Sequence, residues 1–286
     1  MTVVAEVAGS RELLGNLVQR ELRGKYKRST IGWAWSMINP LALALMYTLI
    51  FSVVFKAKLP PSGSGLNSYP LYLLTAMLPF NFMSNGINGS MGALIANSNL
   101  VKKVYFPREV LIVAQVLSWD VSLLIEMGVL SVAFLVVGNM VLPWLPLVVV
   151  FVFFETLFVI GVGLALSVLN VYFRDVQHFV AIFMQLWFYA TPVIYDYQTQ
   201  IRDRILASPT ASNPHPIHHF YNHDWILWLY KANPMVGFSN TYHAFMYKLT
   251  FPVWTDMVWP IVASGLMLWI GMRVFRRLEP RLAEEL

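Results

Sequence analysis

The sequence contains no cysteine, which excludes disulfides and cysteine-ligated metal sites and leaves no indication of the redox compartment. It has no GxxxxGK[ST] phosphate loop, so we expect no ATP binding of the P-loop kind by this chain. HExxH and GxSxG motifs are also missing. Charged residues make up 12% of the chain, against about 25% in soluble domains, which argues against a soluble globular protein.

Apolar residues are abundant instead. They form 57% of the chain, the mean hydropathy is +0.59, and they are gathered into long runs. Residues 1–17 lack the basic start, apolar core and cleavage site of a signal peptide, so none is expected. The composition therefore predicts an integral membrane protein.

Six of the apolar runs are long enough to cross a membrane, which takes about 20 residues. These runs lie at 34–55, 70–91, 110–137, 144–169, 176–195 and 256–273. We predict an all-α integral membrane protein with six transmembrane helices, which forms a single domain over residues 1–286.

The distribution of basic residues predicts the orientation. Most of the Lys and Arg residues lie before the first span, around 92–109, at 170–175 and after residue 271. Because basic residues are enriched in cytoplasmic loops, both ends of the chain are expected to be cytoplasmic.

The segment 196–255 is the longest loop predicted on the opposite side. Its later half is rich in aromatic residues and predicts two short re-entrant or interfacial helices, separated at Asn233-Pro234. Its earlier half holds four loosely spaced histidines with no carboxylate or cysteine to complete a metal site, so a solvated loop is expected. The histidines are His215, His218, His219 and His223.

Polar side chains recur inside the second span. Asn81, Ser84, Asn85 and Asn88 follow three- and four-residue steps and therefore share one helix face. Amides that face lipid are costly, so this face meets either another helix, through hydrogen bonds, or a polar pathway. Both interpretations stay open.

Acidic residues lie within the third and fourth spans, at Asp120, Glu126 and Glu155. An ionisable residue at membrane depth is a functional candidate, and a proton relay is one interpretation. No basic residue is predicted at the same depth, so buried structural carboxylates are favoured.

Aromatic residues form 15% of the chain, and belts of Trp and Tyr at the membrane interfaces account for most of them. Aromatic faces also stack on sugar rings. The candidates for a lining that accepts sugars lie within the second and fifth spans, at Phe80, Phe82, Trp187, Phe188 and Tyr189.

A basic cluster stands directly before the first span. It consists of Arg20, Arg23, Lys25, Lys27 and Arg28, and it is followed by Trp33 and Trp35. Orientation of the chain and anchoring at the lipid headgroups are one explanation of this cluster. Attraction to anionic lipid, worth about 1 kcal/mol per basic residue, fits that role and a substrate-binding role equally.

Four blocks of the sequence resemble the membrane subunit of ATP-binding-cassette polysaccharide exporters, which export O-antigen, teichoic acid, capsule and other lipid-linked glycans. The blocks are RELRGKYKRSTIGWAWSMINPLALALMYTLIF, NSNLVKKVYFPREVLIVAQV, LNVYFRDVQHFVAIFMQLWFYATPVIYD and KANPMVGF. The resemblance extends from about residue 11 to residue 275. The segment around 198–224 is longer than the family pattern.

The resemblance implies a channel-forming permease, not an enzyme, in the bacterial inner membrane. It implies a homodimer that pairs with two copies of a separate ATPase, and ATP and Mg are bound by that ATPase, so this chain carries no cofactor. The implied substrate is a polyprenyl-pyrophosphate-linked polysaccharide, and no nucleic-acid partner is implied. The family fold adds a cytoplasmic amphipathic helix, here 10–30, and a short coupling helix between the second and third spans.

The resemblance also implies roles for individual residues. The basic cluster, from Arg20 to Arg28, would meet the pyrophosphate of the substrate. The implied channel lining is Trp33, Trp35, Phe80, Asn81, Phe82, Asn85, Asn88, Trp187, Phe188 and Tyr189. The implied contacts with the ATPase are Lys102, Lys103, Tyr105, Phe106, Arg108, Arg174 and Asp175.

Three other functions stay open at this point. The first is an exporter of drugs or lipids with the same architecture. The second is a membrane enzyme acting on lipid-linked sugars, for which the four histidines are the candidate catalytic groups. The third is a channel that works without a partner protein.

Overall fold

The computed structural model describes residues 10–25, 32, 34–54, 62–104, 106–197 and 224–282. Within these ranges every regular element is a helix. The chain begins with α2 (Arg11–Lys25), followed by α3 (Ala34–Tyr47), which continues as the π-helix η1 (Thr48–Val54). The fold is therefore all-α over the described residues, as the apolar runs predict.

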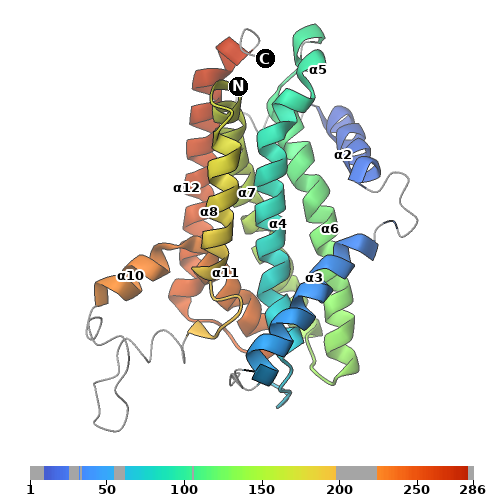
Figure 1. Ribbon diagram of the computed structural model, residues 1–286, viewed down its shortest axis with the longest axis vertical. Coiled ribbons are helices and arrows are strands. Elements are labelled where there is room, and N and C mark those ends of the chain that lie inside the picture. The colour runs from blue at the N-terminus through green and yellow to red at the C-terminus, as the bar shows by residue number, and fades with distance from the viewer. Residues whose placement is uncertain are drawn as a thin grey trace.

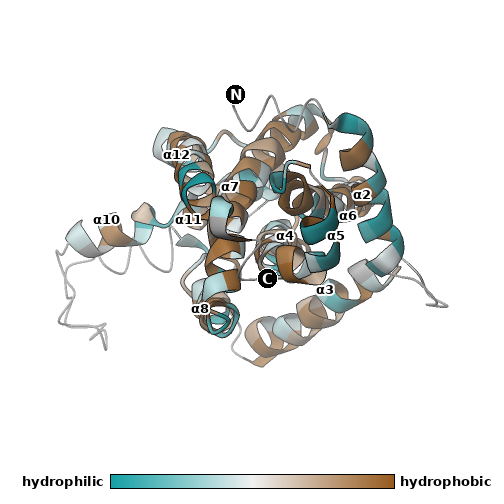
Figure 2. Cartoon of the chain, turned by 90° about the horizontal axis from the view of Figure 1, so that it is seen from above, coloured by the Kyte–Doolittle hydropathy of each residue, from teal (hydrophilic) through white to brown (hydrophobic). Residues whose placement is uncertain are grey.

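Four long helices form the body of the molecule (Figure 1). They are α4 (Tyr69–Ala96), α6 (Glu109–Val136), α7 (Leu145–Tyr172) and α12 (Trp254–Leu278). Helix α4 packs against both α6 and α7, and Figure 2 shows it inside a ring of other helices. Its burial explains why it carries large apolar side chains on most sides, among them Tyr72, Met77 and Ile87.

Glycines permit the close contact between α7 and α12. A Cβ atom on Gly271 would lie 2.0 Å from the carbonyl oxygen of Gly161, and one on Gly161 would lie 2.4 Å from the carbonyl carbon of Met267. Small residues at such crossings let two helix backbones approach each other closely.

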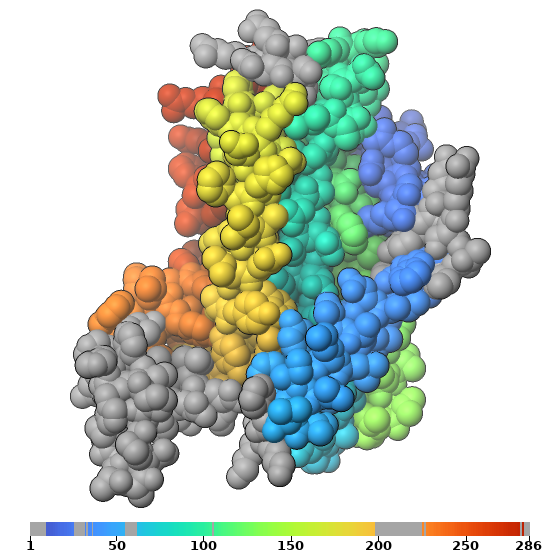
Figure 3. Space-filling model, viewed as in Figure 1, coloured from blue at the N-terminus to red at the C-terminus, as the bar shows by residue number. Residues whose placement is uncertain are grey.

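Two shorter helices, α3 and α8 (Val176–Tyr189), lie on the outer side of α4. Figure 3 shows this face of the molecule, where α4 reaches the surface between α8 and the pair formed by α2 and α3. Both helices leave large apolar side chains exposed, for example Leu45 on α3 and Phe179 on α8. This face is therefore available to lipid or to another protein.

The two ends of the bundle differ (Figure 1). One end carries α2, the short helix α5 (Ser98–Lys103) and the C-terminal turn η6 (Glu279–Arg281). The opposite end carries α10 (Asp224–Ala232), α11 (Pro234–Tyr242), the π-helix η5 (His243–Lys248) and the short turn η2 (Leu142–Trp144). Helices α10 and α11 are separated at Asn233, where the sequence predicts a break, because the Asn233 side chain caps α11 by accepting a hydrogen bond from Met235 N.

Four helices of the described chain are long and apolar enough to cross a membrane: Met37–Val54, Glu109–Val136, Leu142–Tyr172 and Trp254–Leu278. They overlap the first, third, fourth and sixth predicted spans. The second predicted span lies within α4, whose asparagines and serines make it more polar. The number six therefore stays a prediction.

The predicted fifth span, 176–195, extends too far. Helix α8 ends at Tyr189 and is only 14 residues long. Pro192 has no N–H to continue the helix, and the residues around it form turns instead. The apolar run through Val193 and Ile194 is buried in the core as irregular chain, which hydropathy alone does not distinguish from a helix.

Candidate functional site

A polar pocket of about 290 Å³ lies between α3, α4 and α6. Its wall combines three amides, one carboxylate and one serine with three aromatic rings. The lining residues are Trp35, Asn39, Pro40, Asn81, Phe82, Asn85, Trp119, Ser122, Leu123 and Glu126. A bundle of mostly apolar helices thus contains a site where hydrogen-bonding groups and flat rings face the same space.

The pocket amides have no side-chain hydrogen bond to another helix in the described part of the chain. This holds for Asn39, Asn81 and Asn85. One turn further along α4, Asn88 behaves differently, since its Nδ2 donates to the Ser84 carbonyl oxygen at 2.7 Å. Only part of the predicted polar face of α4 therefore opens into the pocket.

Lys25, at the end of α2, joins that helix to the pocket wall. Its Nζ lies 3.4 Å from the centroid of the Trp119 ring and donates to the Ser118 carbonyl oxygen at 2.9 Å. Burial lowers the pKa of Lys25 to about 7, although the negative charges of Glu126 and Glu21 act in the opposite direction. The amine beside the pocket therefore changes its charge near neutral pH.

Helix α2 is held along its length. Leu17 is buried against α6 and its neighbours, with Leu13 and Val18 packed around it. Arg20 Nη2 donates to Asn97 Oδ1, at the end of α4, at 2.8 Å. Arg23 is exposed. The remaining predicted residues of this region, Lys27, Arg28 and Trp33, lie outside the described residues.

The other predicted aromatic residues lie on α4 and α8. Phe80 is buried, and its ring meets Phe188 edge-on at a centroid distance of 5.2 Å. Trp187 Nε1 donates to Asn233 Oδ1 at 2.7 Å, which ties α8 to the break between α10 and α11. Tyr189 is 62% exposed. Of the predicted lining residues, Trp35, Asn81, Phe82 and Asn85 thus line the polar pocket, and Phe80 and Phe188 form this helix contact. Asn88, Trp187 and Tyr189 belong to neither group.

Helix α5 carries the predicted coupling segment at the end of the bundle where α2 lies (Figure 1). Val101 is buried beneath it, whereas Lys102, Lys103 and Val104 are exposed. Phe106 is half-buried. The short helix therefore presents two cations and one apolar side chain to the surroundings, and Tyr105 lies outside the described residues.

The other predicted coupling residues lie near α5. Arg108 Nη1 donates to the Glu279 carbonyl oxygen at 3.0 Å, and Arg108 therefore joins the start of α6 to the C-terminal turn. Arg174 and Asp175 are exposed in the turn between α7 and α8. Nearby, the Tyr172 hydroxyl donates to the Leu278 carbonyl oxygen at 3.0 Å. Arg108 and Tyr172 thus hold the residues at the end of α12 against the start of α6 and the end of α7.

Residues 12–206 match the protein family described as "ABC-2 type transporter", which covers more than half of the chain. This chain belongs to the ABC-2 type transporter family. The match confirms, at the level of the family, the resemblance to membrane subunits of ATP-binding-cassette exporters.

Three relatives indicate where in the ABC-2 family this chain lies. It is 28% identical over 284 residues to "O-antigen export system permease protein RfbA" of Myxococcus xanthus, which covers 99% of each chain. It is 32% identical over 186 residues to a protein of the same name from Klebsiella pneumoniae, covering 64% of this chain and 69% of the relative. It is 31% identical over 84 residues to "Polysialic acid transport protein KpsM" of Escherichia coli, covering 29% and 31%.

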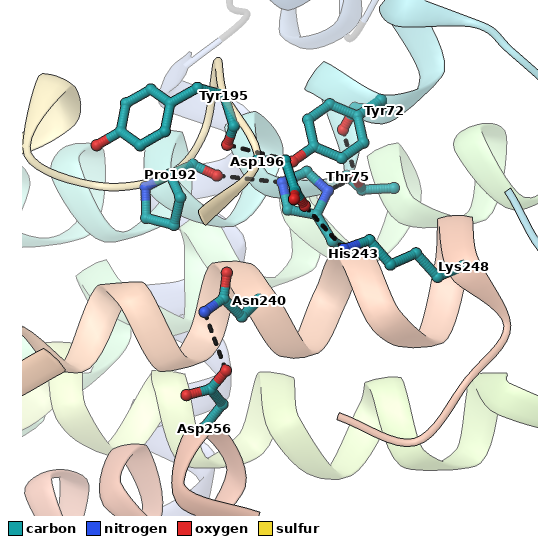
Figure 4. Close-up of polar contacts among 9 residues, drawn as sticks. All are labelled: Tyr72, Thr75, Pro192, Tyr195, Asp196, Asn240, His243, Lys248 and Asp256. Atoms are coloured by element: carbon teal, nitrogen blue, oxygen red, sulfur yellow. Dashed lines mark hydrogen bonds and ion pairs between the residues drawn. The ribbon is translucent and has the colours of Figure 1, made fainter. Parts of the chain in front are cut away.

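This ABC-2 family member also has a buried polar network at the end of the bundle opposite α5 (Figure 4). His243 of η5 lies between Thr75 Oγ1, 2.8 Å from its Nδ1, and the Pro192 carbonyl oxygen, 3.2 Å from its Nε2. Its ring stacks on Tyr72 at 3.9 Å. Burial, aided by the charge of Lys248, lowers the pKa of His243 to about 3, so the ring stays neutral and donates from Nε2.

The same network includes an ion pair. Lys248 Nζ lies 2.8 Å from Asp196 Oδ1, and the Tyr72 hydroxyl donates to the Tyr195 carbonyl oxygen at 3.2 Å. Together with His243, these contacts hold the chain after α8 against α4 and η5 (Figure 4). No sequence pattern predicts this network, because its members are single residues far apart in the chain.

The acidic residues of α6 and α7 are hydrogen-bonded within the ABC-2 fold. Glu155 Oε2 accepts from the Tyr242 hydroxyl at 2.7 Å, and Asp120 Oδ1 accepts from the Thr156 hydroxyl at 3.0 Å. In the described part of the chain neither carboxylate has a Lys or Arg partner. These contacts fit the structural interpretation of the two carboxylates.

Proposed function

We propose that this chain is the channel-forming permease of an ATP-driven exporter that moves a polyprenyl-pyrophosphate-linked polysaccharide out of the cytoplasm. The observation that carries the proposal is the polar, aromatic-walled pocket directly beside Lys25. A relative named as an O-antigen export permease, matched over 99% of both chains, supports the same substrate class. An exporter of drugs would have less use for a wall rich in amides.

The lipid tail of the substrate stays in the bilayer in this proposal, and its pyrophosphate meets the cations of α2. Lys25 and Arg23 are one turn or less from the end of that helix. The glycan then passes amides and aromatic rings, which make many weak contacts and no tight one. A long polymer that is to move requires such contacts, since strong binding at any point would stop it.

A separate ATPase supplies the energy and, in this proposal, docks at the end of the bundle that carries α5. Lys102, Lys103 and Val104 are exposed there and fit a groove that combines negative charge with an apolar floor. The turn with Arg174 and Asp175 extends this surface. With the ATPase in the cytoplasm, both ends of the chain are cytoplasmic and α2 lies at the cytoplasmic interface.

A second copy of the chain completes the channel in this proposal. The outer stripe of α8 is exposed at three- and four-residue steps, with Phe179 74%, Ile182 60% and Leu186 65% exposed. Apolar side chains of α3 and η1 are exposed on the same face. The two copies would meet through these helices, and two ATPase copies would bind below them.

The ATPase requirement tests the proposal. Purified permease in lipid nanodiscs is expected to hydrolyse no ATP until the partner ATPase is added, and a Val104→Glu change is expected to weaken the stimulated rate. Hydrolysis by this chain alone would contradict the assignment. Modification of a lipid-linked sugar by the chain without any ATPase would favour the membrane-enzyme alternative.

A further inference from the structure

The pocket between α3, α4 and α6 has the chemistry of a site for a sugar ring. Asn81, Asn85 and Glu126 offer amide donors, amide acceptors and a carboxylate that accepts hydrogen bonds. Trp35 and Trp119 offer indole faces in the same wall. Ring hydroxyls match the first set, and the C–H face of a sugar matches the second.

An anion does not match this wall. The ionisable residue among the lining residues is Glu126, whose negative charge repels phosphate. Lys25, a cation of the described part of the chain, contacts the ring of Trp119 and is not among the lining residues. The charges therefore place a phosphate beside the pocket and a neutral hydroxylated group inside it.

The wall has polar groups in need of partners. Trp119 Nε1 is a buried donor without a hydrogen bond in the described part of the chain, and the amides of Asn81 and Asn85 make none there either. A buried donor without a partner, such as Trp119 Nε1, is costly, whereas Asn81 is half-buried and Asn85 is exposed, so both amides are accessible to a ligand. A volume of about 290 Å³ lies near the lower limit for small-molecule sites, so the pocket suits a small unit and not a long oligosaccharide.

We propose that this pocket binds the sugar residue attached directly to the pyrophosphate of the lipid-linked substrate, while Lys25 faces the pyrophosphate. The inference rests on the proposed export function and adds a recognition step to it. The permease would select a glycan by its membrane-proximal sugar, before the rest of the polymer enters the channel. Trp119 connects the two parts of this site, because it touches Lys25 and lines the pocket.

Binding to the complete permease–ATPase complex in nanodiscs tests the inference with two probes. One is a polyprenyl pyrophosphate that carries a single N-acetylhexosamine, and the other is the same lipid pyrophosphate without the sugar. The wild-type complex is expected to bind the sugar-bearing probe at least about tenfold more tightly, which corresponds to one or two good hydrogen bonds. The double change Asn81→Ala and Asn85→Ala should bring this ratio towards one without weakening binding of the sugar-free probe.

Asn88→Ala is the matched control. Asn88 has the same side chain on the same helix, but it bonds to its own helix backbone outside the pocket, so this variant should keep the tenfold ratio. Equal binding of both probes by the wild type would overturn the inference and leave the export function standing. Equal loss of both probes in a pocket variant that keeps the wild-type Tm would also overturn it, because these side chains would then serve the lipid pyrophosphate and not its sugar. Failure of the wild type to bind either probe would contradict the proposed function itself.

Discussion

Lys25 and Trp119 hold the N-terminal helix against the body of the molecule. The Lys25 amine lies 3.4 Å from the centroid of the Trp119 ring, and it also donates to the backbone of α6 at Ser118. The indole is at the same time part of the pocket wall. A movement of α2 would therefore change the pocket, which links the basic helix to the site it adjoins.

The protonation of Lys25 predicts a pH dependence of stability. Burial lowers its pKa to about 7 in the folded chain, whereas the ordinary value is 10.5. Between these values the unfolded state binds more protons, so stability increases as the pH rises through this window, and below pH 7 the effect is constant. We expect the Tm of the detergent-solubilised wild type to rise relative to that of Lys25→Gln from pH 7 to 10.

Lys25→Gln retains every other titrating group. The difference in Tm between the wild type and this variant therefore reports the Lys25 amine alone. A difference in Tm that stays flat or decreases over this range would show that the Lys25 amine is not buried against α6.

The contact between α7 and α12 predicts a strong effect of a single methyl group. Gly271→Ala places a Cβ atom 2.0 Å from the Gly161 carbonyl oxygen, and backbone cannot move away as a side chain can. We expect a loss of about 1–3 kcal/mol or more in stability, measured as a decrease in Tm. Gly265→Ala on the same helix has no atom within 4 Å and should be neutral or slightly stabilising. Equal effects of the two changes would contradict the packing.

The exposed stripe of α8 predicts a contact between two copies of the chain. Because the sequence has no cysteine, a single introduced cysteine gives an unambiguous cross-link. Ile182→Cys in native membranes is expected to form a disulfide-linked dimer upon mild oxidation. Val262→Cys on α12, 52% exposed, should not, and a dimer through Val262 instead would place the interface elsewhere.

The ion pair between Lys248 and Asp196 predicts that removing the lysine charge costs more stability than removing the aspartate charge. The Asp196 side chain is 5% exposed and that of Lys248 is 24% exposed. Lys248→Met removes the charge that compensates a buried carboxylate and should lower stability by about 2–3 kcal/mol, while Asp196→Asn leaves a lysine that reaches water and should cost about 1 kcal/mol. Thermal unfolding of both variants and of the double variant measures this, and a larger loss for Asp196→Asn would contradict it.

Local patterns predicted much of the fold. Long apolar runs identified the helices, and Asn233-Pro234 predicted the break between α10 and α11. The end of α8 was missed because Val193 and Ile194 continue an apolar run that the chain uses as buried turns. Hydropathy reports burial and does not report whether the buried backbone is helical.

The pocket was predicted only in part for a related reason. The three- and four-residue spacing along α4 predicted that Asn81 and Asn85 share one face of the helix. This spacing does not show which neighbouring helix the face contacts. Trp119 and Glu126 come from α6, and their place in the same wall follows from tertiary packing. His243 and Thr75 are 168 residues apart, so no local pattern connects them.

Transport in proteoliposomes tests the central claim most directly. Vesicles would contain this chain, its ATPase and a polyprenyl-pyrophosphate-linked glycan on the ATPase side, and a lectin would detect glycan on the other side. The account predicts that the glycan appears there only when both proteins and ATP are present. Movement of the glycan by this chain alone, or no movement with all components present, would contradict it.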